Sequence, residues 1–305
     1  MRMTDRVQGT NGAQLFLSPL SAEGVARAAY RLPTERRGIV TVGPVDFEST
    51  DPFGLALRRF TAQSIGQLVV YPEVIPLPAA PPSPANERRS TTDKPEFLGG
   101  RSEEFHALRQ YVPGDDIRRI NWRASARHDD LIVREDEAPT QNHLTVLLDN
   151  SAVPDGPALD KGAAVAASIL TSMRNRTDPF RLITASGHDT GYVRGPAGLD
   201  KALSILAIVE GTEGTISDPA VAGAQGALVV VTTPGETIRR EALLAYGRVM
   251  FVSLHPSVWD ATLVRSAGSA DAAGNEIRLE LGALEDLTSL WNRAITTLMS
   301  RGGAR

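Results

Sequence analysis

The second half of the chain alternates short apolar runs with amphipathic stretches. Residues 143–149 (HLTVLLD) form a nearly continuous apolar run, as in a parallel strand buried on both faces, and residues 159–176 carry apolar side chains at helical spacing. The same alternation predicts strands at 180–185, 227–233, 249–254 and 277–281, and helices at 198–209, 236–246 and 285–299. Strands separated by helices imply right-handed crossovers and a parallel sheet with both faces covered. We therefore expect a doubly wound α/β domain over residues 141–300.

The first part of the chain has a different pattern. Its strand candidates are short, rich in β-branched residues and bounded by Gly or Pro. They lie at residues 15–17, 38–42, 45–48 and 67–71. Gly43-Pro44 and residues 51–54 are expected to separate them as turns. The pattern predicts a small antiparallel, β-sandwich-like module over residues 10–72, with too few strands for a complete immunoglobulin-like fold.

Prolines dominate the next stretch. Residues 72–84 read PEVIPLPAAPPSP, which neither a helix nor a central strand tolerates, and residues 85–96 are polar. We interpret residues 73–96 as a Pro-rich linker. One reading makes this segment a docking ligand for a proline-binding module, but its composition favours an interdomain spacer.

Composition narrows the class of protein. The 305 residues are 42% hydrophobic and carry a net charge of −4, which argues against nucleic acid as a partner. Cysteine is absent, so disulfides and thiol chemistry are excluded. The sequence shows neither a signal peptide nor an apolar run long enough to span a bilayer, so the chain is expected to be soluble.

Residues 104–127 (EFHALRQYVPGDDIRRINWRASAR) concentrate aromatic, turn-forming and charged residues within a segment that we place at 97–140 and expect to pack on the C-terminal domain. The PGDD piece is typical of a turn, and IRRINW of one or two helical turns. Arginine and aromatic side chains are common at protein interfaces. The candidate binding residues are Arg109, Tyr111, Gly114, Asp115, Asp116, Arg118, Trp122 and Arg127.

The order E-F-x-x-L-R-x-Y-x-P-G-D-D-x-R-x-I-x-W-x-x-S-A-R resembles the signature of the bacterial family called domain of unknown function 58. The resemblance implies a von Willebrand factor A-like fold for the α/β domain. It also implies a MoxR-type AAA+ ATPase as partner, acting on a protein client that the sequence does not identify. Such proteins resemble membrane-associated ones that work at the cytoplasmic face through an N-terminal anchor, which we expect to be absent from this chain.

A von Willebrand A domain holds a divalent metal at the carboxyl ends of its strands, through a D-x-S-x-S motif and later Thr and Asp residues. Here the motif reads Asp149-Asn150-Ser151-Ala152-Val153, so its last position offers no oxygen ligand. The loop at Thr232-Thr233-Pro234-Gly235 lacks the expected Asp, although residues 211–215 still offer hydroxyls. We expect a degenerate site without cofactor, and keep Mg²⁺ at Asp149 and Ser151 as the alternative.

Catalytic motifs are absent from the sequence. It holds no H-E-x-x-H, no P-loop and no G-x-S-x-G elbow. The leading hypothesis is therefore a non-enzymatic interaction module. The family resemblance implies that it is an adaptor for a MoxR-type ATPase in envelope-related complex maturation or chaperoning. One alternative is a metal-dependent protein binder using Asp149 and Ser151. The other is a hydrolase using Asp115 and Asp116, which would have to converge in a cleft.

Overall fold

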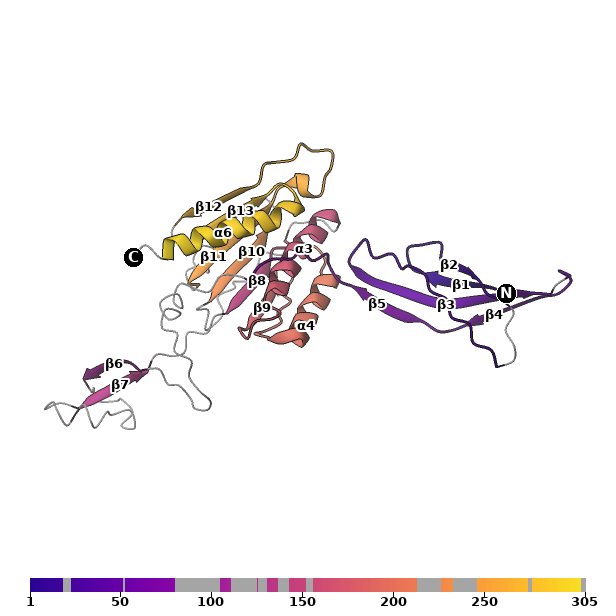
Figure 1. Cartoon of the computed structure of the whole chain (residues 1–305), viewed down its shortest axis with the longest axis horizontal. Coiled ribbons are helices and arrows are strands. Elements are labelled where there is room, and N and C mark those ends of the chain that lie inside the picture. The colour runs from indigo at the N-terminus through magenta and orange to yellow at the C-terminus, as the bar shows by residue number, and fades with distance from the viewer. Residues whose placement is uncertain are drawn as a thin grey trace.

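The computed structural model describes most of the chain (Figure 1). The described residues are 1–18, 23–51, 53–79, 105–110, 125, 131–136, 143–151, 156–212, 226–232, 246–273 and 276–302. Within them lie a mixed sheet with helices, an antiparallel sheet, and a two-stranded hairpin of β6 (Phe105–Gln110) and β7 (Ile132–Asp136). The expected α/β content, with an antiparallel module ahead of it, is confirmed at this level.

The mixed sheet is built from strands that the apolar runs predicted. Its order is β12-β13-β11-β10-β8-β9. The strands are β8 (Leu144–Leu148), β9 (Phe180–Thr184), β10 (Ala227–Thr232), β11 (Arg248–Leu254), β12 (Ser269–Ala273) and β13 (Glu276–Leu281). Neighbours pair in parallel except β12, which runs antiparallel to β13 at the edge. The sequence did not predict β12, because its Ala-rich stretch has no strong strand pattern.

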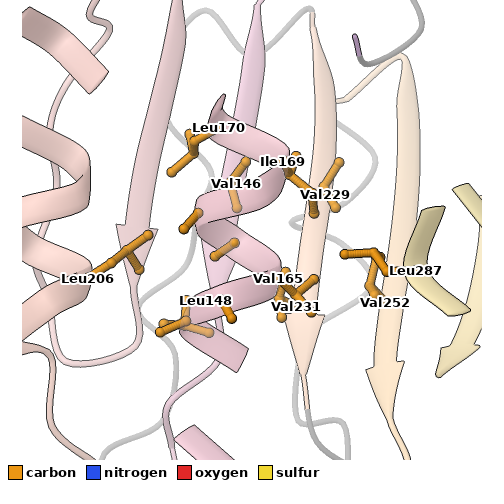
Figure 2. Close-up of a cluster of buried hydrophobic side chains, with 14 of the residues drawn as sticks. Val146, Leu148, Val165, Ile169, Leu170, Leu206, Val229, Val231, Val252 and Leu287 are labelled. Atoms are coloured by element: carbon orange, nitrogen blue, oxygen red, sulfur yellow. The ribbon is translucent and has the colours of Figure 1, made fainter. Parts of the chain in front are cut away.

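Helices cover one face of this sheet. They are α3 (Pro157–Ser172), α4 (Gly195–Ile208) and α6 (Leu287–Gly302), with short 3₁₀ turns η2 (Pro256–Val258) and η3 (Leu284–Asp286). Figure 2 shows Val165 and Ile169 of α3 against Val229 and Val231 of β10. α3 packs against β8 at Gly162, where an added Cβ would lie 3.4 Å from Leu148 Cδ1, an ordinary van der Waals distance. Burial of this face supplies the main hydrophobic stabilisation of the domain.

The N-terminal strands form a single five-stranded antiparallel sheet. They are β1 (Arg2–Val7), β2 (Ala13–Phe16), β3 (Gly38–Thr50), β4 (Leu57–Ala62) and β5 (Gly66–Val70). The order is β2-β1-β3-β4, and β5 also pairs with β3. No second sheet packs on it among the described residues, so the part that is described is one layer and not the sandwich that the sequence suggested.

Gly43-Pro44 does not form the expected turn. It lies inside β3, so the two strands predicted at 38–42 and 45–48 are one strand. The register explains why: Asp5 pairs with Val45 but Val7 pairs with Val42, so β3 carries one extra residue as a β-bulge. A bulge accommodates a proline that cannot donate to the ladder. Gly43 takes φ 96°, and its peptide bond to Pro44 is cis.

Cross-strand pairing separates an apolar row of side chains from a charged row in this sheet. Met3, Phe47 and Phe60 stand opposite one another, and the two Phe rings stack with centroids 4.7 Å apart. The next row, on the other face, brings Glu48 between Arg2 and Arg59, with both ion pairs formed. Residues that pair directly lie on the same face of a sheet, so these two successive rows lie on opposite faces.

No helix within the described residues is long and apolar enough to cross a membrane.

Candidate functional site at the carboxyl ends of the strands

The strand order places the candidate site. From β8 the chain reaches β9 on one side of the sheet and β10 on the other. In an open α/β sheet, the crevice at such a switch point, beyond the carboxyl ends of the strands, is where ligands bind. Asp149 follows β8 directly and Thr232 ends β10, so both lie at this point, which we call the crest.

Asp149 is held by hydroxyl and amide donors. Its Oδ1 accepts hydrogen bonds from Ser151 N at 3.0 Å and Ser151 Oγ at 2.5 Å, and its Oδ2 accepts one from Thr232 Oγ1 at 3.3 Å. The residue is only 6% exposed, and no Lys or Arg of the described chain pairs with it. A buried carboxylate needs such donors, because hydrogen bonding offsets the loss of hydration.

Asn150 ties the crest loops together. Its side-chain amide donates to Glu210 O at 2.5 Å, and its Oδ1 accepts from Ser186 N at 3.2 Å. Its backbone carbonyl accepts from Thr212 N at 3.0 Å. Asn150 is fully buried. The sequence analysis gave this residue no role. An Asn two residues after a buried strand could have indicated a side chain that organises the neighbouring loops.

Thr212 lies beside the crest. A parallel β-bridge pairs Ser151 with Thr212, so the loop after α4 brings its hydroxyl-bearing residue beside the motif of β8. The described crest thus combines one acidic side chain with the hydroxyl-bearing residues Ser151, Thr212 and Thr232. No group of three or more His, Cys, Asp or Glu residues suited to a metal occurs in the described parts. Two of these hydroxyls donate to Asp149, which suits an internal network better than a divalent ion.

A Ser–His pair lies at the end of β9. Ser186 Oγ is 3.1 Å from His188 Nδ1, and Thr184 Oγ1 lies 3.4 Å from the same nitrogen. A nucleophilic serine needs a base that a third group orients. The neighbouring Asp189 instead forms an ion pair with Arg181, which lowers the pKa of its carboxyl group. The geometry describes a local turn network.

The signature residues fall mostly outside the described ranges. Arg109 lies in β6, where it pairs with Val133 of β7, and its side chain is not described. The others, Tyr111, Gly114, Asp115, Asp116, Arg118, Trp122 and Arg127, lie outside the described residues, as does Val153 of the metal motif.

A second group of contacts joins the N-terminal sheet to the helices beside the crest. Arg37 Nη1 donates to Leu206 O at 2.8 Å and Ala207 O at 3.3 Å, at the end of α4. Its Nε lies 2.9 Å from Asp160 Oδ1 of α3, and its side chain is only 7% exposed. Neither residue stood out in the sequence, because adjacent arginines before a strand look like ordinary surface charges. Arg37 and Asp160 line a pocket together with Glu210, whose carbonyl oxygen accepts the hydrogen bond from Asn150.

Comparison with known proteins identifies the family that part of the chain matches. The family model described as "Protein of unknown function DUF58" matches residues 107–245. That range includes most of the signature segment and the crest from Asp149 to Thr232, so the family resemblance is confirmed over it. Comparison with curated proteins gave no match.

Proposed function

From the DUF58 match of residues 107–245, we propose that this protein is a non-enzymatic interaction module that binds partners through its crest. The partner is a MoxR-type AAA+ ATPase, and the protein acts as its adaptor toward a protein client in envelope-related complex maturation or chaperoning. Both partners follow from the family resemblance, and the client is identified only as a protein.

The observation that carries this proposal is the hydrogen bonding of Asp149. Its carboxylate accepts from Ser151 and Thr232 and lies buried at the switch point of the sheet. These bonds fix the loop after β8, so the described crest presents a preorganised surface whose exposed residues include Ser186 and His188. It offers no oriented nucleophile, because His188 has no carboxylate partner among its described contacts. Recognition is the chemistry that such a surface suits best.

The strand order also supports a von Willebrand A-like domain. The order β9-β8-β10-β11-β13 is that of a doubly wound sheet, and the Asp149-Asn150-Ser151 sequence follows its central strand β8. We propose this finer fold assignment because the acidic motif occupies the position at which such domains bind their ligands.

A direct test mixes the purified full chain with the MoxR-type ATPase of the same organism. We expect co-elution and a changed rate of ATP hydrolysis. Ser186→Arg, which places bulk on an exposed crest position, should weaken both effects. Thr296→Arg, on the exposed side of α6, is the matched control and should behave as wild type. No association together with unchanged ATP turnover would contradict the proposal.

The second candidate function is metal-dependent binding. The bridge between Ser151 and Thr212 favours it, because it gathers a second hydroxyl-bearing residue beside Asp149. In that case Asp149, Ser151 and Thr212 would hold Mg²⁺ with water completing the shell. The hydrolase alternative depends on Asp115 and Asp116, outside the described residues, so it stays an expectation from the sequence.

A further inference from the structure

The described start of the Pro-rich linker is bound to the α/β domain. We call residues 73–78 (EVIPLP) the strap. It leaves the N-terminal sheet after β5 and passes across α3 toward α6 (Figure 1). Lys161 of α3 pairs with Glu73, Ser168 of α3 bonds Ile75, and Thr288 and Trp291 of α6 bond the two prolines. The linker is therefore not a free spacer over these residues.

The strap's main chain is recognised at three points. Ser168 Oγ accepts from Ile75 N at 2.9 Å, Thr288 Oγ1 donates to Pro76 O at 3.2 Å, and Trp291 Nε1 donates to Pro78 O at 3.0 Å. Ser168 is fully buried, and its hydroxyl donates to Ala164 O. The hydroxyl oxygen is therefore free to accept the hydrogen bond from the strap. The side chain of Trp291 is also fully buried, which makes its indole N–H a donor that needs a partner.

Ser168 of α3 with Thr288 and Trp291 of α6 line the surface that seats the strap, which we call the groove. The strap's side chains alternate between this groove and solvent. Ile75 and Leu77 are half-buried and pack against the core cluster of the domain, whereas Pro76 and Pro78 are exposed. An extended chain places every second side chain on the same face. The prolines preset the extended backbone, so less conformational entropy is lost on binding. Aromatic-lined grooves recognise Pro-rich peptides by this combination.

We propose that the groove between α3 and α6 is a binding site for extended peptides of the pattern apolar-Pro-apolar-Pro, occupied by the chain's own strap. Because the strap is half-exposed, it buries little apolar surface and its intrinsic affinity for the groove is modest. Its occupancy therefore depends on the high effective concentration of a tethered segment. A partner segment of the same pattern competes with it. When it binds, the N-terminal sheet keeps the Arg37 junction and loses its attachment through the strap.

The test uses a fluorescein-labelled peptide of residues 71–79 (YPEVIPLPA) and the full-length chain. Wild-type protein should bind it weakly, because the strap fills the groove. The double variant Ile75→Asp/Leu77→Asp should bind it at least tenfold more tightly, measured by fluorescence anisotropy. A peptide carrying the same two Asp substitutions is the matched control and should not bind. Adding Trp291→Phe to the double variant keeps an aromatic ring and removes the donor, so affinity should fall roughly fivefold.

A second measurement avoids opening the groove by mutation. Excess unlabelled peptide should speed amide hydrogen exchange of Ile75 in the wild-type chain, since that N–H bonds Ser168 only while the strap is seated. The proposal is overturned if a folded double variant shows no saturable binding, or if the Asp-substituted peptide binds as well. Unchanged exchange of Ile75 at saturating peptide overturns it too. None of these outcomes depends on an ATPase partner.

Discussion

The buried side chain of Arg37 forms an ion pair with the half-buried Asp160 of α3, with Nε 2.9 Å from Oδ1. The same guanidinium donates to Leu206 O and Ala207 O at the carboxyl end of α4, where a cation also meets the negative end of the helix dipole. Arg37 directly precedes β3, so a single side chain fixes the start of the longest N-terminal strand to both α3 and α4.

Arg37→Met should therefore destabilise the protein. Removing the Arg37 guanidinium leaves the carbonyls of Leu206 and Ala207 without this donor and leaves Asp160 with only the exposed Arg36. We therefore expect a loss of about 2 kcal/mol in the free energy of unfolding. Chemical denaturation followed by circular dichroism measures it. Arg36→Met is the matched control: Arg36 contacts the same Asp160, but its side chain is 70% exposed, so little change is expected. Equal effects of the two substitutions would contradict this role.

Thr232→Val tests the network at the crest. The substitution keeps the volume of a residue that is 2% exposed, and removes the hydroxyl that donates to Asp149 Oδ2. A hydrogen bond to a charged group contributes about 1.5–3 kcal/mol, and we expect a loss in that range. Thr296→Val on the exposed side of α6 should leave stability within about 0.5 kcal/mol of wild type. A neutral Thr232→Val would mean that the carboxylate does not depend on this donor.

Divalent metal should leave the melting temperature unchanged. If the hydroxyls of Ser151 and Thr232 serve Asp149, little is left to replace the water shell of Mg²⁺. A ligand that binds only the folded state at 100 times its dissociation constant would instead stabilise it by about 2.7 kcal/mol. Differential scanning fluorimetry with millimolar Mg²⁺ and Mn²⁺ separates the two. A rise that Asp149→Asn abolishes would favour the metal-dependent alternative.

The ion pair of Asp189 with Arg181 gives a prediction for acid stability. The hydrogen bond from Arg181 is the main cause that lowers the pKa of Asp189 from its ordinary value of 3.8. Since the folded-state pKa is the lower one, the stabilisation is present above about pH 4 and is lost as the pH falls through the folded value. Asp189→Asn should flatten stability against pH below pH 4 and lower stability at neutral pH. Thermal melts between pH 2.5 and 7 check this, and an unchanged acid slope would count against it.

The α/β domain was predicted best, because a strand that is buried on both faces has a continuous apolar sequence that is easily recognised. Residues 143–149 and 227–233 contain β8 and β10 in full. The strand β12 was missed because Ser269–Ala273 is a short edge strand of small residues, half-exposed, with little apolar signal. Asp149 and Ser151 were named from the family motif, and residues 211–215 as a loop that offers hydroxyls; composition and periodicity pointed to none of them.

The N-terminal module was predicted less well, for two physical reasons. Gly43-Pro44 is the usual mark of a turn, and only the pairing of β3 with three neighbours shows that it is a bulge within one strand. Contacts such as that of Arg37 with Asp160 join residues more than a hundred positions apart, and no local pattern encodes them. The strap was seen as a spacer because its partners, Ser168 and Trp291, are distant in sequence.

Gly43 offers the sharpest test of the bulge in β3. Its φ of 96° is unfavourable for any residue with a side chain, and an added Cβ would lie 2.0 Å from Ser64 O, a backbone atom that cannot easily move. Gly43→Ala should therefore cost at least about 2 kcal/mol, combining backbone strain with a steric clash. Gly66→Ala is the matched control, because Gly66 lies in β5 with an ordinary φ and nothing within 4 Å of its Cβ position. Hydrogen exchange of β1 and β5 should rise in the first variant only, since both strands pair with β3 around the bulge. Equal protection in the two variants would show that β3 tolerates a side chain at this position, and that the bulge is not fixed by glycine.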